Sequence, residues 1–477
     1  MNAAHRTEAD ERLLDAALQQ LLQPATTAAR VRGLRRARFA AAALLGIAVV
    51  VGTMVLSRQP AVVPAVQNPE PRAPVIDPPP PPLVMTQNVE ELDALPPETQ
   101  NLWCKLSPSE LAHLQRLTGL RRLVIVKDLQ PTGGAGPSGP ELWTDPKPEL
   151  LAPLQALPEL REIQWPQTMR VQAKHIAALV AAPKLESMTF VFDRVVQAPE
   201  LADALANLPR LTALGFMNVP IQGDFLERLA KLPLTRLSFL SCPGLDDKAL
   251  EQIATMRSLR ALSLTFLNGL PAYVNGNCTM PVCKLTAAGL ASIGRLPALR
   301  ELSLESELSD EVLHLLPSRL EKLILGYRFV SPAVASALKP MASLRELSVG
   351  AGPDIEGAER MASLLGTLRL QRLDYCGAPS AALLQAIAQQ PELETLSLQR
   401  HGGEDLAPLT QAPRLRDLVL QNQKDGLRPR PMTLDVLQPL VGCKALQRLR
   451  LFDCGLGAAE VQALLAGKVQ VEVLEYL

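Results

Sequence analysis

The sequence predicts an α/β fold, a solenoid in which short parallel strands alternate with helices. A unit of the form LxxLxL recurs along most of the chain, and most copies are 21 to 26 residues apart. Each copy is followed by a turn and a stretch with helical periodicity, such as DDKALEQIATM (246–256). A fixed period of this size is typical of stacked units that bury their apolar faces only against their neighbours.

Fourteen copies of the unit can be aligned. In LRALSL, residues Leu259, Leu262 and Leu264 alternate with outward positions, as in a strand with one buried face. The clearest copies are LPELREIQW (157–165), LPRLTALGF (208–216), MRSLRALSL (256–264), LPALRELSL (296–304), MASLRELSV (341–349), PELETLSL (391–398), APRLRDLVL (412–420) and KALQRLRL (444–451). The units begin at residues 120, 160, 185, 211, 234, 259, 299, 320, 344, 370, 393, 415, 446 and 471.

Residues 117–477 resemble the leucine-rich repeat family, and CPGLDDKALEQIA (242–254) is similar to its cysteine-containing and ribonuclease-inhibitor-like subtypes. The resemblance implies a curved solenoid with strands on the concave side and helices on the convex side. These subtypes place Cys or Asn in a ladder position after the strand. Here that position holds Cys only at Cys242 and Cys454, and Asn nowhere, so we expect irregular curvature.

The middle outward position of each unit predicts one column of side chains along the concave face. Five of its members are Ser and none is aromatic, whereas Tyr, Trp and Arg usually anchor interfaces. We therefore do not expect a strong binding site there. The column is Val124, Gln164, Thr189, Gly215, Ser238, Ser263, Ser303, Ile324, Ser348, Asp374, Ser397, Val419 and Arg450.

Residues 39–56, FAAAALLGIAVVVGTMVL, contain no charge. A helix of this length spans ~27 Å, enough for a bilayer core. Five Arg lie at positions 30–38, directly before the segment, and only Arg58 and Arg72 follow it within thirty residues. The positive-inside rule then predicts a single-pass anchor in the cell membrane, with a cytoplasmic N-terminus and an extracytoplasmic C-terminal domain. The alternative is a cleaved signal peptide, for which Val63 and Ala65 would form a poor cleavage site.

Four segments follow from these patterns. Residues 1–38 form a cytoplasmic segment with a short amphipathic helix at 10–23, which either docks a partner or only frays. Residues 39–56 form the transmembrane helix. Residues 57–86 form an extended linker, because ten prolines lie between 60 and 82. Residues 87–477 form the repeat domain. The excess of Arg over Lys, 35 against 13, is typical of bacterial proteins from GC-rich genomes.

Several function classes find no support. The formal net charge is zero, which gives no argument for nucleic acid. GAGPSG (134–139) has the GxGxxG spacing, but Pro137 and Pro140 prevent the helix that a phosphate site requires. The five His are scattered over separate repeats. We therefore expect no enzyme, no catalytic residue, no cofactor and no metal site.

Three longer spacings interrupt the repeat, and their extra residues lie at 127–148, 265–284 and 421–432. Each insertion directly follows a strand, so all three are expected to leave one edge of the solenoid and to form a binding rim. The alternative is that surface loops accept insertions anywhere at little entropic cost. Candidate partner-binding residues in these insertions are Trp143, Tyr273, Arg428 and Arg430, types that often dominate binding energy.

The second insertion contains Cys278 and Cys283. An extracytoplasmic location favours disulfides, and no His lies between residues 175 and 314 to complete a zinc site. We expect these two residues to form a disulfide and the other five Cys to be small buried apolar residues.

These patterns predict a membrane-anchored leucine-rich repeat protein that mediates protein–protein interaction on the extracytoplasmic side. The alternative is a transmembrane signal transducer that couples ligand binding outside to the N-terminal segment.

Overall fold

The computed structural model divides the chain into two compact units, Met1–Pro80 and Pro81–Leu477. The predicted cytoplasmic segment, transmembrane helix and most of the linker lie outside the described residues. Within the described part of the chain, no helix is both long enough and apolar enough to cross a membrane. The structure describes residues 83–126, 145–166, 169, 171–191, 199–217, 219–221, 223–265, 272–274, 277–279, 286–305, 310–326, 330–350, 355–401, 403–422, 424–425, 428–429 and 432–474.

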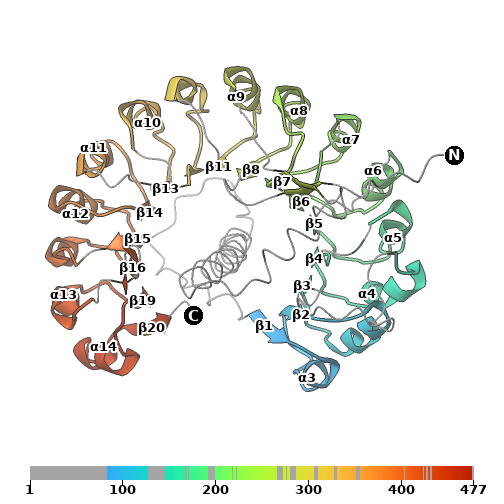
Figure 1. Ribbon diagram of the computed structural model, residues 1–477, viewed down its shortest axis with the longest axis horizontal. Helices are drawn as coiled ribbons and strands as arrows, with labels where there is room; N and C mark the ends of the chain where they lie inside the picture. Colours follow the sequence, from blue (N-terminus) through green and yellow to red (C-terminus); the bar gives the residue numbers. More distant parts are fainter. Residues whose placement is uncertain are drawn as a thin grey trace, which may run out of the picture. The chain divides into compact units, whose positions relative to one another are not determined.

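The second unit is built on one sixteen-stranded parallel sheet whose strands follow one another in chain order (Figure 1). The strands line the inner side of the curve, here called the concave face. They are β1 (Leu83–Thr86), β2 (Asn101–Cys104), β3 (Arg122–Ile125), β4 (Glu162–Gln164), β5 (Ser187–Val191), β6 (Ala213–Met217), β7 (Arg236–Leu240), β8 (Ala261–Thr265), β11 (Glu301–Glu305), β12 (Lys322–Ile324), β13 (Glu346–Gly350), β14 (Arg372–Cys376), β15 (Thr395–His401), β16 (Asp417–Asn422), β19 (Arg448–Phe452) and β20 (Gln470–Leu474).

The predicted fold class is confirmed, because each of the fourteen predicted units contains one strand of the sheet, from β3 to β20. The sheet also has two earlier strands. Strand β1 begins at Leu83, inside the segment predicted as linker. Strand β2 was missed because Thr99 and Cys104 stand where the repeat has Leu, although both side chains are buried as the missing leucines would be.

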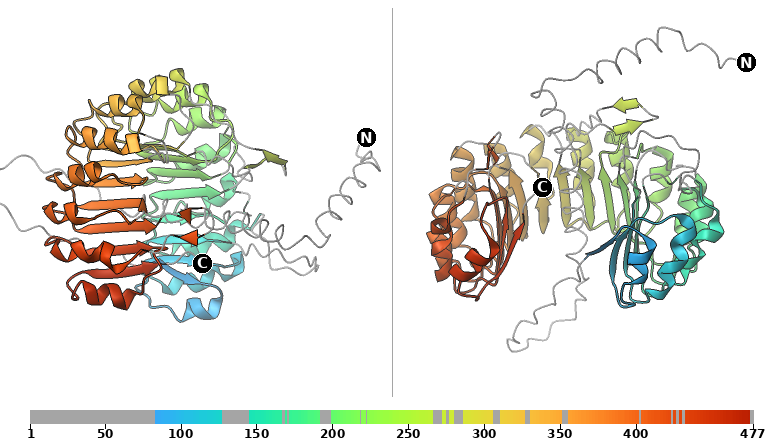
Figure 2. Two further views of the ribbon diagram at one scale, coloured as in Figure 1. Left: turned by 60° about the vertical axis from the view of Figure 1, so that its left-hand side comes forward. Right: turned by 60° about the horizontal axis from the view of Figure 1, so that its bottom comes forward.

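Helices cover the outer side of the sheet (Figures 1 and 2). The α-helices are α3 (Val89–Asp93), α4 (Ala152–Gln155), α5 (Ala173–Ala177), α6 (Pro199–Ala206), α7 (Gly223–Leu229), α8 (Asp247–Ile253), α9 (Ala287–Gly294), α10 (Pro332–Leu338), α11 (Ile355–Leu365), α12 (Ala381–Ala388), α13 (Leu434–Leu437) and α14 (Ala458–Leu464). Some repeats have 3₁₀ turns: η1 (Pro108–Arg116), η2 (Pro148–Leu151), η3 (Asp310–Leu315), η4 (Ala407–Gln411) and η5 (Gln438–Gly442).

Short polar side chains begin several of these helices. Asp246, Ser331 and Ser380 each accept a hydrogen bond from the backbone N–H three residues later. This satisfies a donor that has no partner inside the helix. Substitution of such a cap by Ala typically costs ~1 kcal/mol.

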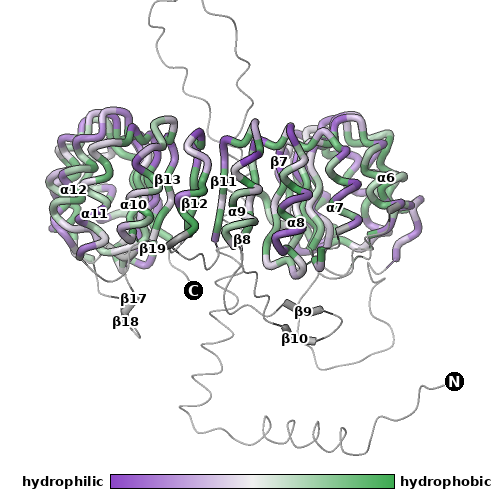
Figure 3. Tube along the Cα trace, turned by 90° about the horizontal axis from the view of Figure 1, so that it is seen from above, coloured by the Kyte–Doolittle hydropathy of each residue, from purple (hydrophilic) through white to green (hydrophobic). Residues whose placement is uncertain are grey.

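A continuous apolar core fills the space between sheet and helices, and apolar positions recur in every repeat (Figure 3). At the centre of the core, equivalent residues of adjacent strands stack on one another. The ring centroids of Phe190 and Phe216 are 5.5 Å apart, and those of Phe216 and Phe239 are 5.6 Å apart. Because each repeat packs against its two neighbours, stability is a sum of local terms along the chain.

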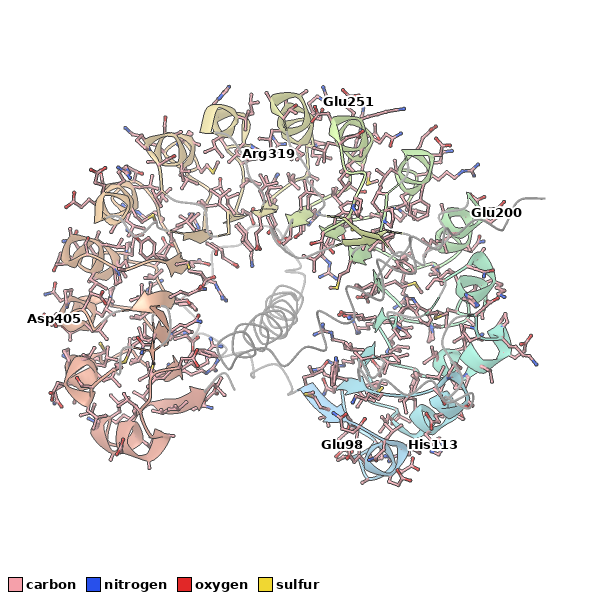
Figure 4. The ribbon with its side chains drawn as sticks, in the orientation of Figure 1. Glu98, His113, Glu200, Glu251, Arg319 and Asp405 are labelled. Carbon is pink, nitrogen blue, oxygen red and sulfur yellow. The ribbon has the colours of Figure 1, made fainter. Side chains whose placement is uncertain are left out.

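Arginine side chains also join successive repeats. Arg319 (Figure 4) donates from Nη2 to the carbonyl oxygens of Gly294, 3.0 Å away, and Leu296, at the end of α9. Arg116 donates in the same way to the carbonyl oxygens of Leu92, in the last turn of α3, and of Leu95, just after it. A cation at a helix C-terminus also interacts favourably with the helix dipole.

The ladder position shows one addition to the prediction. Cys242 and Cys454 are buried as expected, and the thiol of Cys242 donates to the carbonyl oxygen of Phe216, 3.2 Å away. The counted ladder position holds Asn nowhere, as the sequence indicates, but one Asn near it makes a similar contact. Asn422 is 5% exposed and donates from its side-chain amide to the carbonyl oxygen of Asp453, at 3.2 Å. It lies one residue earlier than the repeat count places the ladder.

Candidate binding surface

The register of the sheet aligns equivalent residues of all strands into columns across the concave face. The predicted middle column is confirmed in order, and it extends to Met85 and Trp103 at one end and to Glu472 at the other. Trp103 therefore corrects the expectation of a column without aromatic residues. It comes from strand β2, which the repeat pattern did not reveal.

Nine charged residues occupy the first column of the concave face, and their sign alternates along the sheet. Three adjacent pairs form ion pairs: Arg122 with Glu162 at 3.1 Å, Lys322 with Glu346 at 2.6 Å, and Asp417 with Arg448 at 3.6 Å. In sheet order the nine are Arg122, Glu162, Arg236, Glu301, Lys322, Glu346, Arg372, Asp417 and Arg448.

Burial and opposite charges act together on this column. Burial raises the pKa of the Glu162 carboxyl, while Arg122 and Arg236 oppose the shift. Burial also disfavours the charged form of Arg372, but neighbouring carboxylates, Asp374 first, outweigh it and raise the pKa of Arg372. All of the charged residues of this column except Arg236 thus have an opposite charge beside them on an adjacent strand.

A polar patch lies on β8 and β11, near the middle of the concave face. Ser263 is the Cα partner of Ser303, and Thr265 is the Cα partner of Glu305. The hydroxyl oxygens of Ser263 and Thr265 are 3.4 Å apart. Ser303 is buried and Glu305 is half-buried. The predicted middle column already placed Ser263 beside Ser303, and the register adds Thr265 and Glu305 to the patch.

The three insertions leave the sheet at one edge, because all sixteen strands are parallel and the insertions follow β3, β8 and β16. Strands β3 and β8 are five positions apart in the sheet, and β8 and β16 are six positions apart. At ~4.8 Å per strand, the starting points of the insertions are separated by ~24 and ~29 Å. Residues 265 and 421–422, predicted as insertion, belong to the strands themselves.

Two of the insertions contain short antiparallel hairpins. In the second, β9 (Ala272–Val274) pairs with β10 (Asn277–Thr279), and Tyr273 is the Cα partner of Cys278 (Figure 2). In the third, β17 (Lys424–Asp425) pairs with β18 (Arg428–Pro429). Tyr273 and Arg428 therefore lie in separate hairpins. Trp143, Arg430 and Cys283 lie outside the described residues, so the disulfide stays a prediction.

His175 on α5 holds the end of the first insertion. The ring is fully buried, and its Nδ1 accepts a hydrogen bond from the backbone N–H of Gln172 at 3.0 Å. Nε2 therefore carries the proton and donates to the carbonyl oxygen of Pro146 at 3.0 Å. Asp145, 3.2 Å from Nε2, also pairs with Lys174 at 2.7 Å. Burial lowers the pKa of His175 and favours this neutral ring.

Five cysteines are free thiols: Cys104, Cys242, Cys376, Cys443 and Cys454. Four are buried as expected, and Cys443 is half-buried. Burial raises the pKa of Cys104 to about 12 and those of Cys443 and Cys454 to about 11. These three thiols are therefore protonated and unreactive at neutral pH. Within the described ranges, no three His, Cys, Asp or Glu side chains are placed to hold a metal ion.

No protein-family model and no curated protein matches the sequence. Among solved structures, the chain is similar to an internalin from Listeria monocytogenes, with 16% identity, a TM-score of 0.32, and coverage of 66% of this chain and 88% of that one. It is similar to a leucine-rich repeat protein from Leptospira interrogans, with 14% identity, a TM-score of 0.32, and coverage of 82% and 99%. It is also similar to TLR13 in a complex with ssRNA13, with 17% identity, a TM-score of 0.35, and coverage of 82% and 56%. The solenoid fold is established by the sheet topology, in which the sixteen parallel strands follow one another in chain order.

Proposed function

We propose that this protein is a membrane-anchored leucine-rich repeat protein that binds a protein partner on the extracytoplasmic side. One observation carries the proposal: the three insertions leave the same edge of one continuous sheet. Insertions confined to one face of a repeat scaffold are typical of a binding rim. A rigid sheet can hold such loops at fixed separations, as in other loop-based binding sites.

The spacing of the insertions supports a protein as the partner. Along the curved sheet, the outer two insertions start roughly 50 Å apart, the sum of the two separations, so a molecule that follows the edge and contacts all three must be large. The proposed contacts are Trp143, Tyr273, Arg428 and Arg430. Large aromatic side chains and Arg supply most of the binding energy in many interfaces.

The anchor and its orientation are supported by the sequence. The uncharged segment 39–56 is long enough to span a bilayer, and the Arg residues before it favour a cytoplasmic N-terminus. The linker that follows would hold the repeat domain away from the membrane.

A second function, signal transduction across the membrane, is supported by the apolar face of residues 10–23. In that case, binding outside would change a cytoplasmic contact of this helix. Deletion of residues 1–30 would then abolish a cellular response but leave partner binding intact.

Site-specific photo-cross-linking of the full chain in native membranes tests the binding proposal. The cross-linking amino acid replaces Tyr273 or Arg428 at the edge, or Glu200 or Glu251 as controls on the outer helices (Figure 4). We expect one protein to be captured from the edge positions and not from the controls. Capture of the same protein from the control positions alone would refute the proposed edge.

A further inference from the structure

Glu305 is an exception among the charged residues of the concave face. Oppositely charged neighbours act on the pKa values of Glu162, Arg372 and Arg450. For Glu305, burial alone acts, and it raises the pKa of the carboxyl. No described residue forms an ion pair or a hydrogen bond with the side chain of Glu305. A carboxylate that is partly removed from water without a partner costs free energy in the unbound protein.

A second unpartnered polar group lies on the same face, two residues earlier on β11. Ser303 is 4% exposed, and its hydroxyl has no hydrogen-bond partner among the described residues. Ser303 and Glu305 point to the same side because side chains alternate along a strand. Buried hydroxyls are normally hydrogen-bonded. A buried hydroxyl and a carboxylate that both lack a partner among the described residues, on one face of one strand, therefore favour a ligand site.

The neighbouring strand leaves room beside the carboxylate. Gly326 follows β12 with a φ of +59°, a conformation that favours glycine. A Cβ atom added at Gly326 would lie 3.0 Å from Cγ of Glu305. The absence of a side chain at Gly326 therefore leaves room for the aliphatic part of the Glu305 side chain. No side chain of residue 326 covers the patch on this side.

We propose that Glu305 and Ser303 form a site on the concave face that binds a lysine side chain of the protein partner. This inference rests on the proposed function, and it assigns a contact that the edge insertions do not provide. It also gives the concave face a role that its small, Ser-rich middle column did not predict.

The chemistry of an ammonium group matches the patch. An ammonium group has three N–H donors and no acceptor. Glu305 offers a carboxylate, and Ser303, Ser263 and Thr265 offer hydroxyl oxygens on the same two strands. Binding would neutralise the carboxylate of Glu305, which, unlike that of Glu162, has no described cation beside it.

The test uses the full chain in lipid nanodiscs and a displayed library of random peptides as the probe. We expect the wild-type protein to enrich peptides that share one Lys position, and Glu305→Gln to lose that enrichment. Because a hydrogen bond to a charged group is involved, a synthetic peptide from the wild-type selection should bind Glu305→Gln about tenfold more weakly. Replacement of the peptide's Lys by norleucine should weaken binding to wild type by the same factor. It should not weaken binding to Glu305→Gln any further.

Two further variants control for folding and for general charge effects. Glu251→Gln makes the same chemical change on α8, on the exposed outer side, and should not change peptide affinity. Ser303→Ala removes only an unpaired hydroxyl, so it should fold normally and weaken binding. Equal affinity of wild type and Glu305→Gln, or selected peptides without a shared Lys, would overturn the inference.

The outcome can be separated from that of the proposed function. If edge positions cross-link a partner but Glu305→Gln binds it normally, the Lys site is refuted and the rim stands. If Glu305→Gln weakens partner binding while the edge positions capture nothing, the Lys site stands and the rim is refuted.

Discussion

Arg122 and Glu162 form an ion pair on the concave face, with Nε and Oε1 3.1 Å apart and only 10% and 12% of their side chains exposed. The pair joins β3 to β4 and begins the alternation of charge in the first column. Its partners come from repeats separated by the first insertion. The pair therefore stabilises the register of the sheet at one of the two places where the spacing between units is longest.

The first prediction concerns this pair. Arg122→Met leaves Glu162 partly buried without its nearest cation, which typically costs ~3 kcal/mol of folding free energy. The double variant Arg122→Met with Glu162→Leu removes both charges and should recover most of the loss. Denaturant unfolding followed by circular dichroism measures both. A double variant as unstable as the single one would contradict this account.

The second prediction is a pH dependence caused by His175. Burial lowers the pKa of His175 in the folded state, so below an unfolded-state pKa of ~6.5 the unfolded chain binds a proton that the folded chain does not. The contribution of His175 to stability is therefore complete above that pH and is lost progressively as the pH falls below it.

The measurement compares the thermal midpoints of wild type and His175→Asn from about pH 8 to about pH 5. The charged groups facing the ring are Asp145 and Lys174, and Asp145→Asn serves as the control for their contribution. We expect the advantage of wild type to shrink as the pH falls. A difference that does not change with pH would exclude the buried neutral ring.

The sequence predicted fourteen strands because the LxxLxL unit repeats with Leu at its core positions. It missed β2, where Thr99 and Cys104 fill those positions. The alignment of units placed Ser263 beside Ser303, but the ion pairs of the first column and the burial of Ser303 and Glu305 depend on side-chain positions that only the structure gives. The role of His175 was hidden for the same reason, since its partner Pro146 lies 29 residues earlier in the chain.

The third prediction concerns the thiols. Alkylation of the folded, unreduced protein should leave Cys278 and Cys283 unmodified, because we expect them to be joined in a disulfide. Closing so short a loop contributes ~2 kcal/mol in the chain-entropy model. Cys104 and Cys454 should react only after unfolding, because they are buried and their thiols have raised pKa values. Mass spectrometry after alkylation that finds both Cys278 and Cys283 labelled would disprove the disulfide.

The fourth prediction is the topology. Five Arg precede segment 39–56 and almost none follow it, which favours a cytoplasmic N-terminus. A reporter enzyme that is active only in the cytoplasm should be silent when fused after residue 477 and active when fused before residue 1. Substitution of the five Arg by neutral residues should weaken this preference. A silent N-terminal fusion together with an active C-terminal one would reverse the orientation.

The fifth prediction separates the rim from the scaffold. Each insertion can be shortened so that the spacing between units returns to about 25 residues, the period of the uninterrupted repeats. Each strand that precedes an insertion stays paired with its neighbours on both sides, and stability in a solenoid is a sum of local terms, so the trimmed protein should fold. Partner capture from the edge should be lost, while circular dichroism and the unfolding midpoint stay close to those of wild type.

Trimming one insertion at a time refines the result. Because the starting points lie ~24 and ~29 Å apart, a large partner should keep partial affinity when either outer insertion is removed, and should lose most when the central one after β8 is removed. His175 should be kept in the first variant, since it holds the returning chain at Pro146. If a folded, fully trimmed protein still binds its partner, the edge is not the binding surface, and Glu305→Gln then tests whether the concave face is.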